Sequence, residues 1–300
     1  FIRLNPNSMT FSHARTPAQS LSEYGRGVAG GLVFSLPLLF TVEVWDAAIT
    51  LSPLRLLAWL GLTFALLLLY NRFAGLRKEA TWLECAIDSV EELGLGIVIS
   101  AFVLWILGRF EGAAFNEIFS KTVMEAMTVA IGVSVGTAQL GESENTSSDS
   151  PGDEAPDDES NDAHGQNFWS QLAITLCGAV LFVNNVAPTD EILQLAVEVA
   201  FWKLFLIAIL CLVCGAYLLF YAEFRGANRI SRPQNAPILV RDAVLNYAVA
   251  LLAAALMLFF FGRFENESFQ TIVTQTVIAG IPATLGASVG RLLLQVNSDG

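Results

Sequence analysis

Long apolar runs separated by short polar stretches fill most of the chain. A helix that crosses a bilayer needs roughly 20 mostly apolar residues, and eight runs approach or exceed that length. We expect helices over residues 27–45, 53–70, 86–107, 115–140, 168–186, 195–221, 243–261 and 269–294. The pattern predicts an all-α polytopic membrane helix bundle with eight transmembrane helices.

The two halves of the chain resemble each other. The sequence Gly-Arg-Phe-Glu at 108–111 recurs at 262–265, and residues 115–136 then align with 269–290 without a gap. Because charged and glycine positions match as well as apolar ones, chance is a poor explanation in such an apolar sequence. Weaker matches extend to the earlier helices of each half. The sequence therefore predicts two four-helix repeats.

A strongly acidic stretch separates the halves. Residues 142–162 contain nine acids and no base, with Pro, Gly and Ser among them. Such a composition does not support a packed core, so we expect a disordered linker. The predicted organisation is an N-terminal segment at 1–25, a first membrane repeat at 26–140, the linker at 141–167 and a second membrane repeat at 168–296.

The positive charges favour one orientation. With eight spans, eleven of the sixteen Lys and Arg residues fall on the side that holds the termini and the linker. A re-entrant fourth helix would make the two sides about equal. Since positive residues favour the cytoplasmic side, we expect both termini and the linker to be cytoplasmic. The repeats are then parallel and related by a pseudo-two-fold axis along the membrane normal.

The fourth and eighth predicted helices carry small residues at helical spacing. Gly132 and Gly136 align with Gly286 and Gly290, and small side chains let helix backbones approach closely. We expect these faces to pack the two repeats on each other, or to line a narrow polar path at the axis. Pro282 suits either interpretation, because it kinks a helix and frees a carbonyl group.

Several acidic residues lie within or beside the predicted spans. Charged groups in a membrane segment are costly and usually face protein or water. They form a candidate ion pathway; the competing explanation, which we weight more heavily, is a structural role in loop caps and in a salt-bridged helix start. The candidates are Glu43, Asp88, Glu91, Glu92, Glu117, Glu125, Glu191 and Asp242.

The repeated Gly-Arg-Phe-Glu turns form a second candidate site. They fall at the outer connection before the fourth and eighth helices, and carry Arg109, Glu111, Arg263 and Glu265. A structural clamp, within each turn or across the axis, is the first interpretation. The second and more specific interpretation is a ring of charged side chains that selects ions.

Composition argues against several function classes. All four cysteines lie in apolar segments, so packing explains them better than redox or metal chemistry. We expect no cofactor and no metal site. Without a nucleophile–histidine set or a phosphate-binding glycine loop, no enzyme activity is indicated. The net charge of −12 and the membrane class argue against nucleic-acid binding.

Three segments carry a family resemblance. They are Gly-x-x-Phe-Ser-Leu-Pro-Leu-Leu-Phe-Thr-Val-Glu-Val-Trp at 31–45, Asn-Val-Ala-Pro-Thr-Asp-Glu-Ile at 185–192 and Ala-Thr-Leu-Gly-Ala-Ser-Val-Gly-Arg at 283–291. With them the chain resembles a family of bacterial multi-pass integral membrane proteins of unknown function, over about 25–294. The resemblance implies an inner-membrane location and assigns no activity and no functional residues.

Together these features predict an ion channel or small-solute transporter, with a cation or a proton as permeant. The competing hypothesis is a non-transporting membrane protein, such as a scaffold, a complex subunit or a lipid-binding protein. The expected partners are the lipid bilayer and inorganic cations or protons. Homo-oligomerisation is left open.

Overall fold

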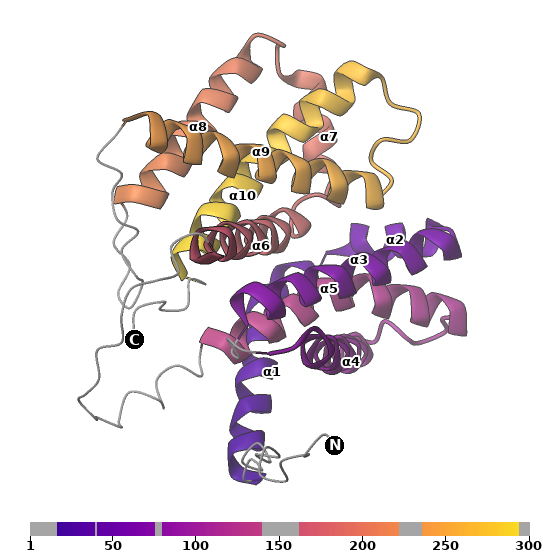
Figure 1. Ribbon diagram of the computed structural model, residues 1–300. Coiled ribbons are helices and arrows are strands. Elements are labelled where there is room, and N and C mark those ends of the chain that lie inside the picture. Colours follow the sequence, from indigo (N-terminus) through magenta and orange to yellow (C-terminus); the bar gives the residue numbers. More distant parts are fainter. Residues whose placement is uncertain (1–16, 40, 76–79, 140–161, 222–235, 294–300) are drawn as a thin grey trace, which may run out of the picture.

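The computed structural model describes residues 17–39, 41–75, 80–139, 162–221 and 236–293. Ten α-helices and no strand make up this part of the chain (Figure 1), which confirms the all-α class. In chain order they are α1 (Pro17–Leu39), α2 (Val42–Thr50), α3 (Pro53–Ala74), α4 (Trp82–Ile106), α5 (Phe115–Gln139), α6 (Asp162–Asn184), α7 (Asp190–Glu198), α8 (Lys203–Tyr221), α9 (Ala236–Phe260) and α10 (Phe269–Leu293).

Five of the described helices are long and apolar enough to cross a membrane. They are α3, α4 and the stretches Phe115–Ala138, Leu239–Phe260 and Phe269–Arg291 of α5, α9 and α10. The apolar parts of α6 and α8 are shorter. Large hydrophobic side chains such as Phe102, Trp105 and Phe205 are exposed, as in a protein whose surroundings are lipid. Eight spans remain a prediction.

The continuous helices predicted over 27–45 and 195–221 are wrong, because each is two helices. After α1 ends at Leu39, Thr41 is extended (φ −95°, ψ 110°) and α2 begins at Val42. The Thr41 hydroxyl donates to the carbonyl oxygen of Pro37 at 2.8 Å, which satisfies an acceptor at the helix end. In the second half, α7 ends before the extended residue Val199, and α8 begins at Lys203. An apolar pattern does not reveal such breaks, since both short helices continue it.

Helix starts also differ from the predicted boundaries. α1 begins at Pro17, inside the predicted N-terminal segment, and α6 begins at Asp162, inside the predicted linker. Polar residues open both helices, so hydropathy alone places each start too late. The rest of the predicted linker, at 141–161, lies outside the described residues.

Glycines allow two helix pairs to approach until their backbones touch. A Cβ atom added at Gly30 of α1 would lie 2.5 Å from the carbonyl oxygen of Gly132 and 2.6 Å from Cα of Gly136, both in α5. A Cβ at Gly178 of α6 would meet the carbonyl oxygen of Gly286 and lie 3.0 Å from Cα of Gly290, both in α10. We call these contacts the α1/α5 and α6/α10 glycine seams.

The glycine seams correct the expected role of the small-residue faces. We expected α5 and α10 to pack on each other, but each packs mainly on a helix of its own half, α5 on α1 and α10 on α6. α5 also contacts α2, α3 and α4, and α10 also contacts α7, α8 and α9. Each half therefore has its own central helix, and neither lies on a shared axis.

The halves are joined mainly through α3 and α6. The Ser170 hydroxyl of α6 donates to the carbonyl oxygen of Phe73 at 2.5 Å. Trp59 of α3 packs edge-on against Phe260 and Phe261, with ring centroids 5.3 Å apart. A two-fold axis would repeat the α3–α6 contact between α8 and α1, yet these two described helices make no comparable contact. The contact between the halves is therefore not repeated, and the expected pseudo-two-fold relation is not confirmed.

We predict that Gly178→Ala lowers the free energy of unfolding by about 1–3 kcal/mol, because the added methyl group forces the α6 and α10 backbones apart. Gly94→Ala is the matched control, since Gly94 lies within a helix and a Cβ there meets nothing within 4 Å. Thermal melting of the purified protein in detergent measures both variants. Equal melting temperatures would contradict close packing at the seam.

Candidate functional site

Asn71 of α3 is the centre of a buried hydrogen-bond network that joins three helices. Its side-chain nitrogen donates to the Ser89 hydroxyl at 3.1 Å and to a Glu92 carboxylate oxygen at 2.7 Å, both in α4. The Ser134 hydroxyl of α5 donates to the Asn71 side-chain oxygen at 3.0 Å. Asn71, Ser89 and Ser134 are buried and Glu92 is half-buried. The network, which we call the Asn71 network, holds one carboxyl group inside the helix bundle.

The second half has a smaller, uncharged network at the aligned positions. The side-chain nitrogen of Asn246 in α9 donates to the Ser288 hydroxyl of α10 at 3.0 Å. Ser288 in turn donates to the carbonyl oxygen of Gly215 in α8 at 3.4 Å. Asn246 aligns with Glu92, and Ser288 with Ser134. The carboxyl group at this depth is thus confined to the first half.

Glu125 is the most deeply buried acid of the described residues. Its side chain is 0% exposed on α5, and one carboxylate oxygen accepts a hydrogen bond from the Trp45 indole nitrogen of α2 at 3.1 Å. The other oxygen has no partner among the described residues. The Arg109 guanidinium lies 4.0 Å from the centroid of the Trp45 ring, within cation–π range. Trp45 therefore connects an exposed cation with a buried carboxyl group.

Polar residues continue from Glu125 toward the start of α5. Lys121, only 8% exposed, pairs with Glu117 at 2.5 Å. Residues four apart share one face of a helix, so Glu117, Lys121 and Glu125 form a line along α5. One turn further in, Thr128 accepts a hydrogen bond from Asn184 of α6. We call these four α5 residues the α5 polar face.

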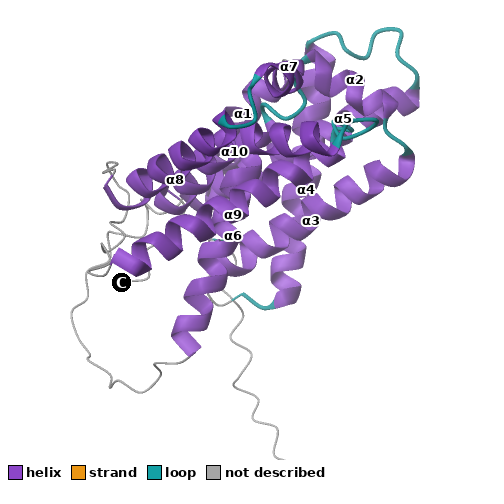
Figure 2. Ribbon diagram, turned by 90° about the horizontal axis from the view of Figure 1, so that it is seen from above, coloured by secondary structure: helices purple, strands orange, loops and turns teal. Residues whose placement is uncertain are grey.

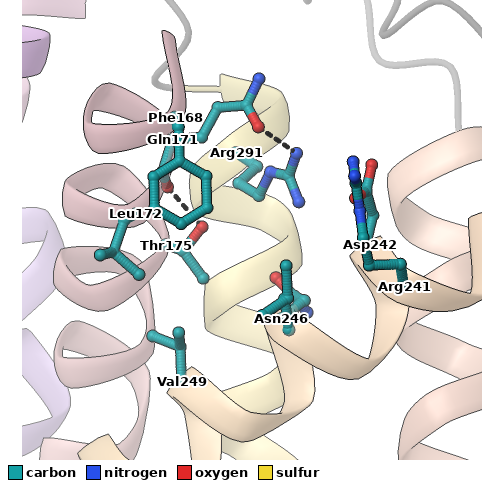
Figure 3. Close-up of a pocket in the computed structure, with 10 residues that line it drawn as sticks. Phe168, Gln171, Leu172, Thr175, Arg241, Asp242, Asn246, Val249 and Arg291 are labelled. Carbon is teal, nitrogen blue, oxygen red and sulfur yellow. Dashed lines mark hydrogen bonds and ion pairs between the residues drawn. The ribbon is translucent and has the colours of Figure 1, made fainter. Parts of the chain in front are cut away.

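A cavity of about 570 Å³ lies between α6, α9 and α10 (Figure 3). Its polar lining includes Arg241 and Asp242 at the start of α9, and Gln171 of α6, which accepts from Arg291 of α10 at 2.9 Å. Asp242 pairs with Arg241 at 3.1 Å. The remaining lining residues are Phe168, Leu172, Thr175, Leu245, Asn246 and Val249. We call this cavity the second-half pocket; it is of a size that holds small organic ligands.

The other predicted pathway acids lie nearer the helix ends. Glu43 and Glu191 are in the first turns of α2 and α7, where a negative charge interacts favourably with the helix dipole. Glu91 is exposed and accepts a hydrogen bond from the Tyr24 hydroxyl of α1 at 2.6 Å. Asp88 is half-buried one turn earlier on α4. The structure therefore does not bring the eight candidate acids together in one site.

The two Gly-Arg-Phe-Glu turns have the same backbone shape and different partners. Gly108 and Gly262 both have positive φ, at 70° and 73°, which L-residues with a Cβ rarely adopt. The Arg263 guanidinium pairs with Asp190 at the start of α7 at 2.7 Å. Glu265 pairs with Arg55 of α3, so this turn also binds the two halves together.

Figure 2 shows that most of the described loops gather at one end of the bundle with α2 and α7, and we call it the α2/α7 end. The two Gly-Arg-Phe-Glu turns belong to these loops. The ion pairs of the second turn, at Arg263 and Glu265, run to α7 and α3 rather than across a central opening. Arg263 and Glu265 thus make the contacts of a clamp, Arg109 lies over the Trp45 ring, and the roles of Arg109, Glu111, Arg263 and Glu265 stay a prediction.

Sequence reasoning missed most of the partners in these networks. Asn71, Ser89 and Ser134 are single polar residues within apolar runs, and each is buried and hydrogen-bonded. Arg291 was counted only as an orienting charge, although it is 6% exposed in the pocket. A polar residue inside an otherwise apolar helix is a usable signal, but its partners are far away in sequence.

The long apolar helices and their exposed hydrophobic side chains define a helical integral membrane protein. The chain belongs to the family described as "Putative integral membrane protein (DUF2391)", which matches residues 23–294. This confirms the family resemblance seen in the sequence. No curated protein and no solved structure matches the chain.

We predict that Asn71→Ala destabilises the protein by about 1–3 kcal/mol, because it leaves the buried Ser134 and Glu92 groups without their partner. Asn116→Ala is the control, since Asn116 is an exposed asparagine on α5. Loss of helical circular dichroism on heating in detergent compares the two variants. If both melt like the unmodified protein, the Asn71 network does not stabilise the fold.

Proposed function

We propose that the protein carries a small ion across the membrane, with a proton or another cation as permeant, and that the first half contains the pathway. The observation that supports this most strongly is Glu125, a fully buried carboxyl group on a central membrane helix with one unpartnered oxygen. Burying a carboxylate in an apolar interior costs several kcal/mol or more. Because burying the Glu125 carboxyl group costs this much free energy, its presence suggests a function beyond packing.

The α5 polar face gives the pathway an entrance at the α2/α7 end. Glu117 is half-buried, Lys121 is nearly buried and Glu125 is fully buried. In the second half the aligned residues are Thr271, Gln275 and Ala279, which carry no charge. The graded burial of charged groups on one copy alone favours a route through the first half.

The Asn71 network is the second polar site along the proposed pathway. Ser134 lies nine residues beyond Glu125 on α5, about 14 Å along the helix axis at 1.5 Å per residue. Met127 and Ile131, both fully buried, lie between them on α5. Buried apolar side chains therefore separate the two polar sites. This separation favours a transporter that changes conformation, or a protein that transfers protons, over an open channel.

The membrane arrangement that we propose has eight spans, with α1, α6 and α8 crossing in addition to the five helices of sufficient length. α2 and α7 then lie at the outer surface, and both termini face the cytoplasm of a cell whose inner membrane holds the protein. The excess of Lys and Arg on the opposite end supports this orientation. The aligned halves are proposed to be parallel repeats, each with one short extra helix.

A non-transporting membrane protein is the second candidate. The observation in its favour is the dense packing at the glycine seams and the uninterrupted burial of residues 121–136 on α5. In that case Glu125 and Glu92 serve structure alone, and no enzyme activity is proposed under either hypothesis.

We predict that the protein in liposomes dissipates a proton or cation gradient, and that Glu125→Gln and Glu92→Gln each slow the flux at least fivefold. Glutamine keeps the shape and can still accept the Trp45 and Asn71 hydrogen bonds, but carries neither a negative charge nor an exchangeable acid proton. A pH-sensitive dye inside the vesicles, and ion-selective dyes for Na⁺, K⁺ and Ca²⁺, record the flux.

Glu198→Gln is the control, because Glu198 is an exposed acid at the end of α7. It should leave the flux unchanged. Absence of flux for every cation tested, with the protein folded and inserted, would reject transport and favour the second candidate.

A further inference from the structure

Arg291 raises a question that the proposed pathway does not answer. Its guanidinium is 6% exposed at the second-half pocket and donates to the neutral Gln171 side chain. Its Nε has no partner among the described residues. A buried guanidinium is normally paired with a carboxylate or a phosphate. Here the only lining carboxylate, Asp242, pairs with Arg241 and acts on Arg291 through its charge without a direct ion pair.

The pocket lining is therefore positively charged. It contains two arginines and one acid among its described residues. Figure 3 shows Arg291 between Gln171 on α6 and Arg241 with Asp242 on α9. Two guanidinium groups near one opening are an arrangement suited to a phosphate, whose oxygens accept paired N–H bonds from arginine.

Apart from Thr175 and Asn246, the rest of the pocket lining is apolar, and most of it lies deeper along the helices. Leu245 and Val249 follow Arg241 by one and two turns of α9, and Phe168 and Leu172 line the α6 side. In Figure 3, Val249 is at the opposite end of the cavity from Arg291. A ligand that fills this space has an anionic head and an apolar tail.

We infer that the second-half pocket binds the phosphate of a membrane phospholipid, with the guanidinium groups of Arg291 and Arg241 on the phosphate and the beginning of an acyl chain against Leu172, Leu245 and Val249. The depth order of these residues along α9 matches the order of headgroup and chain in a bilayer. A free phosphate ion would satisfy the arginines and leave the apolar wall without a partner.

The first half shows that the fold itself does not need these charges. Arg241 and Arg291 align with Ile87 and Thr137. At the aligned place between α1 and α4, the Tyr24 hydroxyl instead donates to Glu91 at 2.6 Å and links the two helices. The second half has Leu172 and Leu245 at those positions, and the pocket lies between them. In the second half the two arginines and the opening therefore occur together.

We predict that the full-length protein in nonionic detergent binds dioctanoyl phosphatidic acid, and that Arg291→Gln weakens this binding tenfold or more. Isothermal titration calorimetry measures the dissociation constant. Arg241→Gln is a second variant, at an exposed side chain whose replacement should leave the fold intact; it should weaken binding by a smaller factor. Lys203→Gln, a cation at the α2/α7 end, should have no effect.

Two competitors identify which part of the ligand is recognised. Inorganic phosphate that competes as well as the lipid would show a site for soluble anions and overturn the lipid assignment. Dioctanoylglycerol that competes equally would show an apolar groove and overturn the role of the arginines. Unchanged affinity in both arginine variants would reject the pocket as the site. None of these outcomes depends on ion flux, so the lipid site and the proposed transport fail separately.

Discussion

Close backbone contact at the two glycine seams is the constraint on which the rest of the structure depends. Because Gly30 allows α1 to touch α5, and Gly178 allows α6 to touch α10, each half can surround its own central helix. Van der Waals packing of this kind is the main attraction between helices in lipid, where apolar surface gains little by leaving the solvent. A larger side chain at either position would open the helix pair and expose the polar groups of the central helix to lipid.

The positions of the buried polar side chains depend on this central packing, and the two halves differ in which polar groups they bury. The first half buries Glu125 and holds Glu92 with Asn71, whereas the second half has neutral residues at the aligned sites and buries Arg291 at a pocket. Such groups are stable within apolar helices only where a partner is near. Their different partners are the basis of the two separate proposals, cation passage in the first half and anion recognition in the second.

The way the halves meet explains why neither purpose requires a central pore. α3 packs on α6, and the α8–α1 contact that a two-fold axis would demand is not made. Trp59, Phe260 and Phe261 fill part of the junction between them. The ion route that we propose therefore lies within the first half, along its central helix, rather than between two equivalent halves.

Local sequence information was sufficient for the helical membrane class, the family and most of the helix positions, because the apolar periodicity of a membrane helix is encoded within each run. It also pointed to Glu92, Glu125 and Asp242 as unusual. Pro37 indicates that the helix can break near the end of α1, but the apolar pattern that runs through Thr41 does not show that a separate helix follows. The sequence also could not distinguish an α5–α10 contact from the α1/α5 and α6/α10 seams. Small residues indicate that a helix packs closely, but they do not specify which helix it packs against.

What only the tertiary structure decided was which residues meet. The Asn71 network joins residues 18 and 63 positions apart in sequence, the Trp45 contact with Glu125 spans 80, and Arg291 reaches Gln171 across 120. Each of these contacts depends on how whole helices are placed, and no local pattern encodes that placement. The sequence by itself determined that the chain is a helical membrane protein with charges inside it. The packing of glycine against glycine decided where those charges lie and what they face.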